Sequence, residues 1–205
     1  MKTITRFTAF LVVIFLFLAL NNSSAATAIW VNTSGGVWTT AANWQSGNIP
    51  AANDDIQFST AGTYTITGVP SLNVRSLKVS DGVFVTLQAS ATASLSINGS
   101  TSATNLDISS GGSLTLGGGA AYVLTLTFAT TALQVANISG IMTLNSYSAF
   151  ASGIANTTVN VGGTLNLNAA TSTSFVTTNM ICSVLGIINA NAAITTLTTS
   201  AATLS

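Results

Sequence analysis

The chain contains no histidine and no glutamate, and its 205 residues include only four basic and four acidic side chains. General acid–base catalysis needs titratable groups placed in pairs, and a nucleophilic serine or cysteine needs a neighbouring base. After Asp107 the sequence has no charged residue at all. We therefore expect a protein that is not an enzyme. Nucleic-acid binding is also excluded, because it requires a basic surface.

Cysteine and proline are nearly absent as well. Cys182 is the one cysteine of the sequence, so no intrachain disulfide framework can form. Its apolar setting, "NMICSVLGI", predicts a buried and unreactive thiol. The two prolines, Pro50 and Pro70, precede the most regular part of the sequence and leave its backbone donors intact. Stability must come from burial and backbone hydrogen bonding.

The segment from Met1 to Ala28 has the layout of a cleaved signal peptide. Lys2 and Arg6 precede an apolar run over residues 8–20, and the small-residue triplet at 26–28 predicts cleavage after Ala28. The apolar run is shorter than the roughly 20 residues that a membrane-spanning helix needs. We therefore expect an exported chain without a transmembrane helix, located outside the cell or on its outer surface.

Short alternating runs fill the sequence beyond residue 54, among them "TYTIT", "VFVTLQ", "SLTLGG" and "TLNLN". Alternation with many β-branched residues predicts strands, and no stretch holds a helical stripe. Five segments share one plan: a short strand, a glycine corner and a second short strand. The corner glycines recur at intervals of about 23 to 30 residues, a range typical of stacked repeats, and they are Gly82, Gly112, Gly140, Gly163 and Gly186.

A repeat of this length made only of strands predicts an all-β fold, a parallel β-solenoid with one coil per repeat. Glycine would supply corners with positive φ. Asn145, Asn168 and Asn191 are candidates for stacked amide ladders. A β-sandwich is the competing fold, since it also contains many short strands, but the near-regular corner spacing favours the solenoid. The predicted division is a signal peptide (1–28), a cap with the first strands (29–75) and the coils (76–205).

The segment "GGVWTTAANWQSGNIPAANDD" (35–55) holds two of the three tryptophans and two of the four acidic residues. A solenoid needs closed ends, because an open coil is a template for further strands. Trp30, Trp38 and Trp44 would bury enough area to close the first coil, with help from Phe58 and Tyr64. At the other end "TTLTTSAATLS" continues the pattern without a cap, so we expect a chain cut in mid-repeat, the front of a longer protein.

The stretch from Trp30 to about Leu87 resembles the N-terminal unit of large exported bacterial repeat proteins. Its matching segments are "GGVWTTAANWQSGNIPAANDDIQF", "TYTI" and "VRSLKVSDGVFVTL". These families are the autotransporter-associated β-strand repeat proteins and the adhesin-like proteins with PEP-CTERM or type IX secretion tails. The resemblance implies a right-handed parallel β-helix on the cell surface with an adhesive or matrix role, and it implies no catalytic residues. The sequence lacks the sorting or barrel domain that such proteins carry at the C-terminus.

Two binding sites are candidates. Trp38 and Trp44 would form an aromatic platform for a sugar ring if one ring stayed exposed. Asn53, Asp54 and Asp55 offer oxygen ligands for calcium, although calcium takes six to eight oxygens and a polar turn that opens a strand explains the cluster better. Threonine pairs such as Thr63 and Thr65 are reminiscent of ice-binding arrays, but the motif does not recur in one register in the sequence.

These observations predict a non-catalytic, adhesin-like structural protein without a cofactor, the N-terminal part of a larger cell-surface protein. Its partners would be surface glycans, other cells or matrix. The alternative is a secreted carbohydrate-binding module that uses the Trp38–Trp44 platform.

Overall fold

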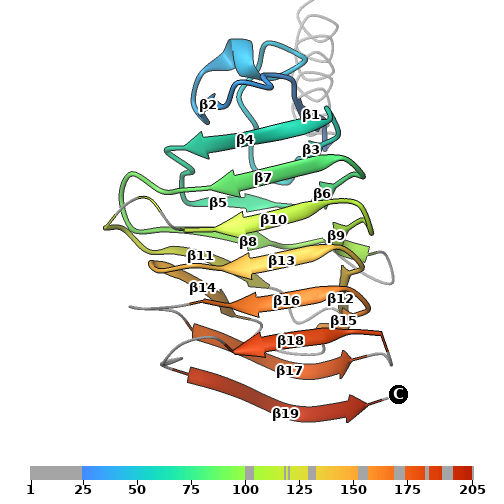
Figure 1. The fold of residues 1–205 in the computed structure, drawn as a ribbon. Coiled ribbons are helices and arrows are strands. Elements are labelled where there is room, and N and C mark those ends of the chain that lie inside the picture. The colour runs from blue at the N-terminus through green and yellow to red at the C-terminus, as the bar shows by residue number, and fades with distance from the viewer. Residues whose placement is uncertain are drawn as a thin grey trace, which may run out of the picture.

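The computed structural model describes residues 25–99, 104–117, 119, 121–128, 133–151, 157–168, 174–182, 185–190 and 196–204. Within these residues the protein is all-β, with parallel strands in two stacked sheets and one short 3-10 helix, η1 (Ala41–Asn43) (Figure 1). Residues 1–24 of the predicted signal peptide, and Asn191 of the predicted amide ladder, lie outside the described residues. None of the helical structure described is long and apolar enough to span a membrane.

Seven described strands form one sheet, in the spatial order β18 (Ile187–Ala190), β16 (Thr164–Leu167), β13 (Ile141–Leu144), β10 (Ser113–Leu116), β7 (Val83–Leu87), β4 (Gly62–Thr67) and β2 (Gly36–Val37). Twelve described strands form the other, in the order β1 (Thr27–Trp30), β3 (Asp55–Phe58), β6 (Ser76–Val79), β9 (Thr104–Ile108), β12 (Gln134–Ile138), β15 (Thr157–Val161), β17 (Ser174–Cys182), β14 (Ser148–Ala151), β11 (Leu124–Phe128), β8 (Ala93–Ile97) and β5 (Leu72–Val74), with β19 (Thr196–Leu204) beside β17.

The stack has three faces. The twelve-stranded sheet covers two of them, one with β3, β6 and β9 and one with β5, β8 and β11, and the seven-stranded sheet covers the remaining one. The chain follows the faces in turn, so that β6, β7 and β8 form one unit and β9, β10 and β11 form the next. Each strand pairs in parallel with the corresponding strands of the units before and after it. Stacked parallel pairing of this kind is compatible with the predicted β-solenoid. The sequence repeat contained two strands per unit, whereas the structure adds a third strand to the unit: β8, β11 and β14.

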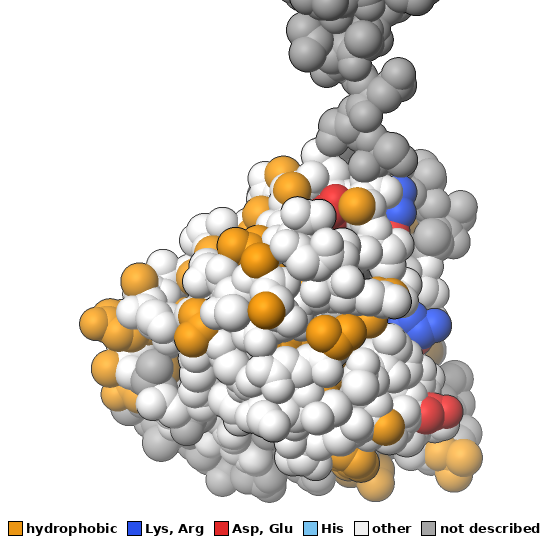
Figure 2. Space-filling model, turned by 90° about the horizontal axis from the view of Figure 1, so that it is seen from above, with side chains coloured by type: hydrophobic (Ala, Val, Ile, Leu, Met, Phe, Trp, Pro, Cys, Tyr) orange, Lys and Arg blue, Asp and Glu red, His pale blue; other side chains and the backbone are white. Residues whose placement is uncertain are grey.

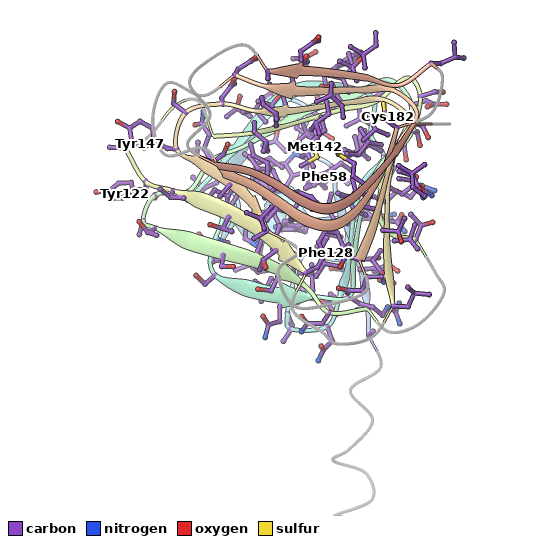
Figure 3. All side chains as sticks on the ribbon, turned by 90° about the horizontal axis from the view of Figure 1, so that it is seen from below. Phe58, Tyr122, Phe128, Met142, Tyr147 and Cys182 are labelled. Atoms are coloured by element: carbon purple, nitrogen blue, oxygen red, sulfur yellow. The ribbon has the colours of Figure 1, made fainter. Side chains whose placement is uncertain are left out.

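Apolar side chains stack in columns inside the molecule. One inward column runs Tyr64, Val85, Leu114, Met142 and Leu165, from strand to neighbouring strand of the seven-stranded sheet. On the opposite side the register aligns Trp30, Phe58, Val79, Ile108, Ile138, Val161 and Cys182. Seen from below, the labelled side chains of Phe58, Phe128 and Met142 lie inside the stack (Figure 3), and they belong to one core cluster of buried apolar residues. Because alternate residues of a strand face the same side, the alternating pattern predicts which residues enter these columns.

The five predicted corner glycines all lie between the first and second strands of a unit. Only Gly82 needs positive φ, at 75°, so the proposed reason for the other four corners was wrong. Those corners stack directly on one another instead. A Cβ atom on Gly112 would lie 2.7 Å from the carbonyl oxygen of Ser80, and one on Gly163 would overlap the carbonyl oxygen of Gly140. Close packing of backbone on backbone therefore selects glycine at these corners.

Amide side chains form short ladders along the stack, as expected for stacked β structure. Asn160 donates to the side-chain oxygen of Asn137 over 2.8 Å, and Asn189 donates to that of Asn166 over 2.8 Å. Both pairs lie on outward-facing strand positions. Each bond ties one unit of the stack to the next.

The end of the stack that holds β1 and β2 is covered by the segment 31–54 (Figure 1). This segment contains β2 and η1, and it returns to β1 through an antiparallel bridge between Trp44 and Trp30. β1 begins at Thr27 and pairs with β3, so it crosses the predicted boundary between residues 28 and 29.

Candidate functional site: the cap and the exposed face of the seven-stranded sheet

Trp38 and Trp44 meet inside the cap. Their ring centroids lie 4.9 Å apart in an edge-to-face arrangement, and Trp44 makes a second such contact with Trp30 at 5.1 Å. Trp30 in turn stacks on Tyr64. The Trp44 indole N–H donates to the carbonyl oxygen of Trp38 over 2.8 Å, and that of Trp30 donates to Asn32 over 2.7 Å. The cluster joins the cap segment to the first strands of the stack.

This burial removes the predicted sugar platform. Trp38 and Trp44 have relative exposures of 0% and 1%, so neither ring offers a face to a ligand. A sugar can stack only on an exposed aromatic face. The structure instead places both side chains in the hydrophobic core, because the end of the stack has large apolar surface to cover. Trp38 and Trp44 thus help to close the end of the stack.

The two adjacent aspartates point in different directions and bind different partners. Asp54 is buried, and its carboxylate accepts hydrogen bonds from the backbone N–H groups of Ala26 and Ala51. Asp55 lies on the outward side of β3, where its carboxylate binds the Arg75 guanidinium and the Ser76 hydroxyl. The hydrogen bond from Arg75 is the main reason why the pKa of Asp55 lies below its usual value.

The two aspartates of the candidate calcium site are therefore engaged by protein donors. Within the described ranges no group of three or more histidine, cysteine or acidic residues is placed to hold a metal ion. Asn53, which precedes the two aspartates, has a positive φ of 67°. This conformation marks a tight turn before β3, which is the polar turn that the sequence analysis favoured over a calcium site.

The exposed face of the seven-stranded sheet carries no charge. None of its strands contains an acidic or basic residue, and its outward side chains form two columns. One column aligns Thr65, Thr86, Thr115, Thr143, Asn166 and Asn189; the other aligns Thr63, Phe84, Ser113, Ile141, Thr164 and Ile187. Phe84, Ile141 and Ile187 have relative exposures of 46%, 41% and 52%, so apolar groups stand at alternate levels of this face.

The threonine column corrects one expectation from the sequence. Four threonines do share one register in successive units, although the second column mixes threonine with apolar residues and serine. The sequence contains a spacing that indicates this column. Four of its members lie three residues after a corner glycine, namely Thr115, Thr143, Asn166 and Asn189. This spacing was missed because Gly82 is level with Gly111 and not with Gly112, so Thr86 lies four residues after its corner glycine.

The few charged side chains gather on another face. The outward positions of β3, β6 and β9 hold Asp55, Lys78 and Asp107, and Lys78 lies 3.7 Å from the Asp107 carboxylate. In the view from above, blue and red atoms lie along one side and the rest of the visible surface is uncharged or apolar (Figure 2). The outward charged residues of β3, β6 and β9 and the uncharged sheet face thus lie on different faces of the stack.

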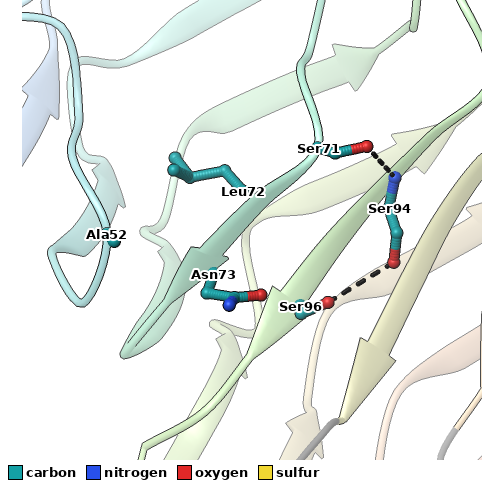
Figure 4. A pocket seen from close by; sticks show the side chains of 6 residues that line it. All are labelled: Ala52, Ser71, Leu72, Asn73, Ser94 and Ser96. Atoms are coloured by element: carbon teal, nitrogen blue, oxygen red, sulfur yellow. Dashed lines mark hydrogen bonds between the residues drawn. The ribbon is translucent and has the colours of Figure 1, made fainter.

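A hollow lies on the third face of the stack. Its lining residues are Ala52, Ser71, Leu72, Asn73, Ser94 and Ser96, from the cap segment, β5 and β8 (Figure 4). The Ser94 backbone N–H donates to the Ser71 hydroxyl over 3.1 Å, and the hydroxyls of Ser94 and Ser96 lie 3.4 Å apart. The small side chains make this a polar depression without a titratable group.

Cys182 is buried, as its apolar setting predicts, and its thiol lies 3.3 Å from the carbonyl oxygen of Gly186 (Figure 3). Tyr122, by contrast, is 48% exposed at the edge of the molecule.

Comparisons of the chain with protein-family models, with curated proteins and with solved structures found no match.

Proposed function

We propose that this chain is a non-catalytic, exported structural protein of the adhesin-like type, built as a right-handed parallel β-helix. It would be the N-terminal part of a larger cell-surface protein, and its uncharged sheet face would bind neutral glycans through many weak contacts. The layout of the segment from Met1 to Ala28 supports export, and the stacked parallel pairing of the described strands supports the helix.

The observation that carries this proposal is the pair of outward columns on the seven-stranded sheet. Hydroxyl and amide groups recur at every level of one column, at the spacing of about 4.8 Å between neighbouring strands. Sugar hydroxyls pair with such groups, and sugar rings pack on exposed apolar side chains such as Phe84 and Ile141. Because the groups repeat along the stack, weak contacts can add through multivalency.

Location is tested first, with an antibody raised against residues 60–200 on fractionated producing cells. The proposal requires the antigen at the cell surface in a band larger than this chain. An antigen confined to the cytoplasm would overturn export, and a free band no larger than this chain would overturn the larger surface protein.

Binding is tested with an array of neutral polysaccharides, using the chain clustered on beads. Phe84→Ser together with Ile141→Thr replaces two apolar residues of the second column with hydroxylated ones and keeps the column uncharged. We expect a loss of about tenfold or more in apparent affinity, which corresponds to roughly 1.4 kcal/mol. The matched control is Val31→Thr, which changes an exposed apolar residue of the cap, 39% exposed, away from this face. Equal binding by the variant and the control would exclude the sheet face as the binding surface.

A further inference from the structure

The buried carboxylate of Asp54 forms no ion pair with a basic side chain in the described part of the chain. Its Oδ1 atom accepts the backbone N–H of Ala26 over 2.9 Å, and its Oδ2 atom accepts that of Ala51 over 2.8 Å. The residue is only 9% exposed. The ion pairs of the described residues join Arg75 to Asp55 and Lys78 to Asp107. Arg75 pairs with Asp55 and acts on Asp54 without contacting it, so the hydrogen-bond donors in direct contact with this buried carboxylate are neutral backbone groups. Direct contact with a cation would stabilise a buried carboxylate further.

The nitrogen that donates to Oδ1 of Asp54 belongs to Ala26, the residue directly before β1. The Ala26 carbonyl oxygen accepts the backbone N–H of Asp55 over 2.8 Å, and β1 starts at the next residue. In the sequence, Ser23 and Ala25 occupy the third and first positions before the Ala25–Ala26 bond. Small residues at those two positions are what a leader peptidase requires.

We propose that a leader peptidase cleaves the bond between Ala25 and Ala26, and that the new N-terminal ammonium of Ala26 forms an ion pair with Asp54. Water adds across the peptide bond: Ala25 leaves with the new carboxylate, and the Ala26 nitrogen takes up protons to become the ammonium. The nitrogen that donates to Asp54 as an amide then carries a positive charge in direct contact with the carboxylate. This inference rests on the export part of the proposed function.

Two neighbouring cleavage sites also have small residues at both required positions, and both damage the fold. Cleavage after Ala26 removes the carbonyl oxygen that binds Asp55 and leaves Thr27 at the end of the chain. Cleavage after Ala28, which the sequence alone favoured, also removes the first two residues of β1, including the buried Ala28 side chain. Of the three sites, cleavage after Ala25 alone keeps β1 together with both hydrogen bonds of Ala26, and it places the new ammonium on the nitrogen that contacts Asp54.

The first experiment determines the mature N-terminus. The full chain is produced in an exporting bacterial host, and the secreted product is measured by intact mass and N-terminal sequencing. We expect a chain that begins at Ala26. A product that begins at Thr27 or Ile29 would overturn this inference and leave export standing. A chain that still begins at Met1 would overturn both.

The second experiment tests the ion pair on the secreted product. Lys78→Arg removes the other amine of the mature chain, so that acetylation acts on the α-amino group alone and leaves one N–H donor on Ala26. We expect acetylation to lower Tm by about 2–4 °C in this background and to have no effect when Asp54→Asn is added. An equal shift in both backgrounds would overturn the ion pair.

A reactivity measurement keeps the test decisive if the Asp54→Asn variant does not fold. The rate of acetylation of the α-amino group is then compared between the folded chain and the chain in urea. A paired ammonium reacts several-fold more slowly in the folded chain, because the reagent needs the free amine. Equal rates would overturn the inference.

Discussion

Trp44 donates its indole N–H to the backbone carbonyl oxygen of Trp38 over 2.8 Å, and the two rings meet edge to face inside the cap. One contact thus joins two turns of the cap segment, while the ring of Trp44 also packs on Trp30 from β1. The cap and the first unit of the stack share one apolar cluster, so we expect them to unfold together.

The first prediction concerns Trp44 itself. Trp44→Ala should reduce the free energy of unfolding by about 3–5 kcal/mol, because it leaves a large cavity in a buried cluster. Trp44→Phe should cost less, since it keeps one aromatic ring and loses the N–H donor and only part of the buried indole volume. Urea denaturation measures both. The control is Val37→Ala, at an exposed cap position, which should change stability by less than about 0.5 kcal/mol. A Trp44→Ala variant as stable as this control would contradict the cluster.

The second prediction separates two uses of glycine. Gly163→Ala places a methyl group on the carbonyl oxygen of Gly140, and Gly47→Ala meets no atom within 4 Å but has φ of 66°. Asparagine tolerates the conformation at position 47, so Gly47→Asn should be milder than Gly47→Ala, which costs about 1–2 kcal/mol. Gly163→Asn should be no more stable than Gly163→Ala, because overpacking at this position costs about 3 kcal/mol with either side chain. Thermal denaturation of the four variants checks this pattern; rescue by asparagine at position 163 would contradict the stacked corner.

The third prediction concerns Asp55 and pH. The hydrogen bond from Arg75 holds the pKa of Asp55 below its unfolded value, so this carboxylate binds a proton less readily in the folded chain. Its contribution is present above the unfolded pKa and is lost as pH falls through the folded pKa. Arg75→Gln should therefore reduce stability at neutral pH by at most about 1 kcal/mol, since Arg75 is half exposed, and the difference should vanish near pH 2. A difference in Tm that persists at pH 2 would show another role for Arg75.

The fourth prediction concerns the hydroxyl of Tyr64. It is buried without a hydrogen-bond partner among the described residues, and burial raises its pKa to about 12. The folded chain holds this proton more tightly than the unfolded chain, so stability should fall as pH rises from about 10 towards 12. Tyr64→Phe removes that loss and an unsatisfied polar group, and it should be as stable as the parent at pH 7 or more stable. Urea denaturation at pH 7 and pH 11 tests this; a less stable variant at pH 7 would indicate a partner for the hydroxyl.

The sequence by itself determined the all-β class, the parallel stacking and the positions of the corner glycines. It did so because alternation and glycine spacing are local patterns that repeat with the unit, and each strand buries the same face as its neighbour. Aromatic residues near the N-terminus also indicated which segment covers the end of the stack. The burial of Cys182 follows from the same alternation.

Only the tertiary structure decided the third strand of each unit, whose segments have variable spacing, and the burial of Trp38 and Trp44. Whether an aromatic ring is a core residue or a ligand platform depends on what packs against both its faces, and those neighbours come from β1, β4 and the cap together. The partners of Asp54 and Asp55 were equally out of reach of the sequence. Adjacent residues on a strand point to opposite sides, and their partners include groups about 20 to 30 residues away along the chain, where only the folded register brings them together.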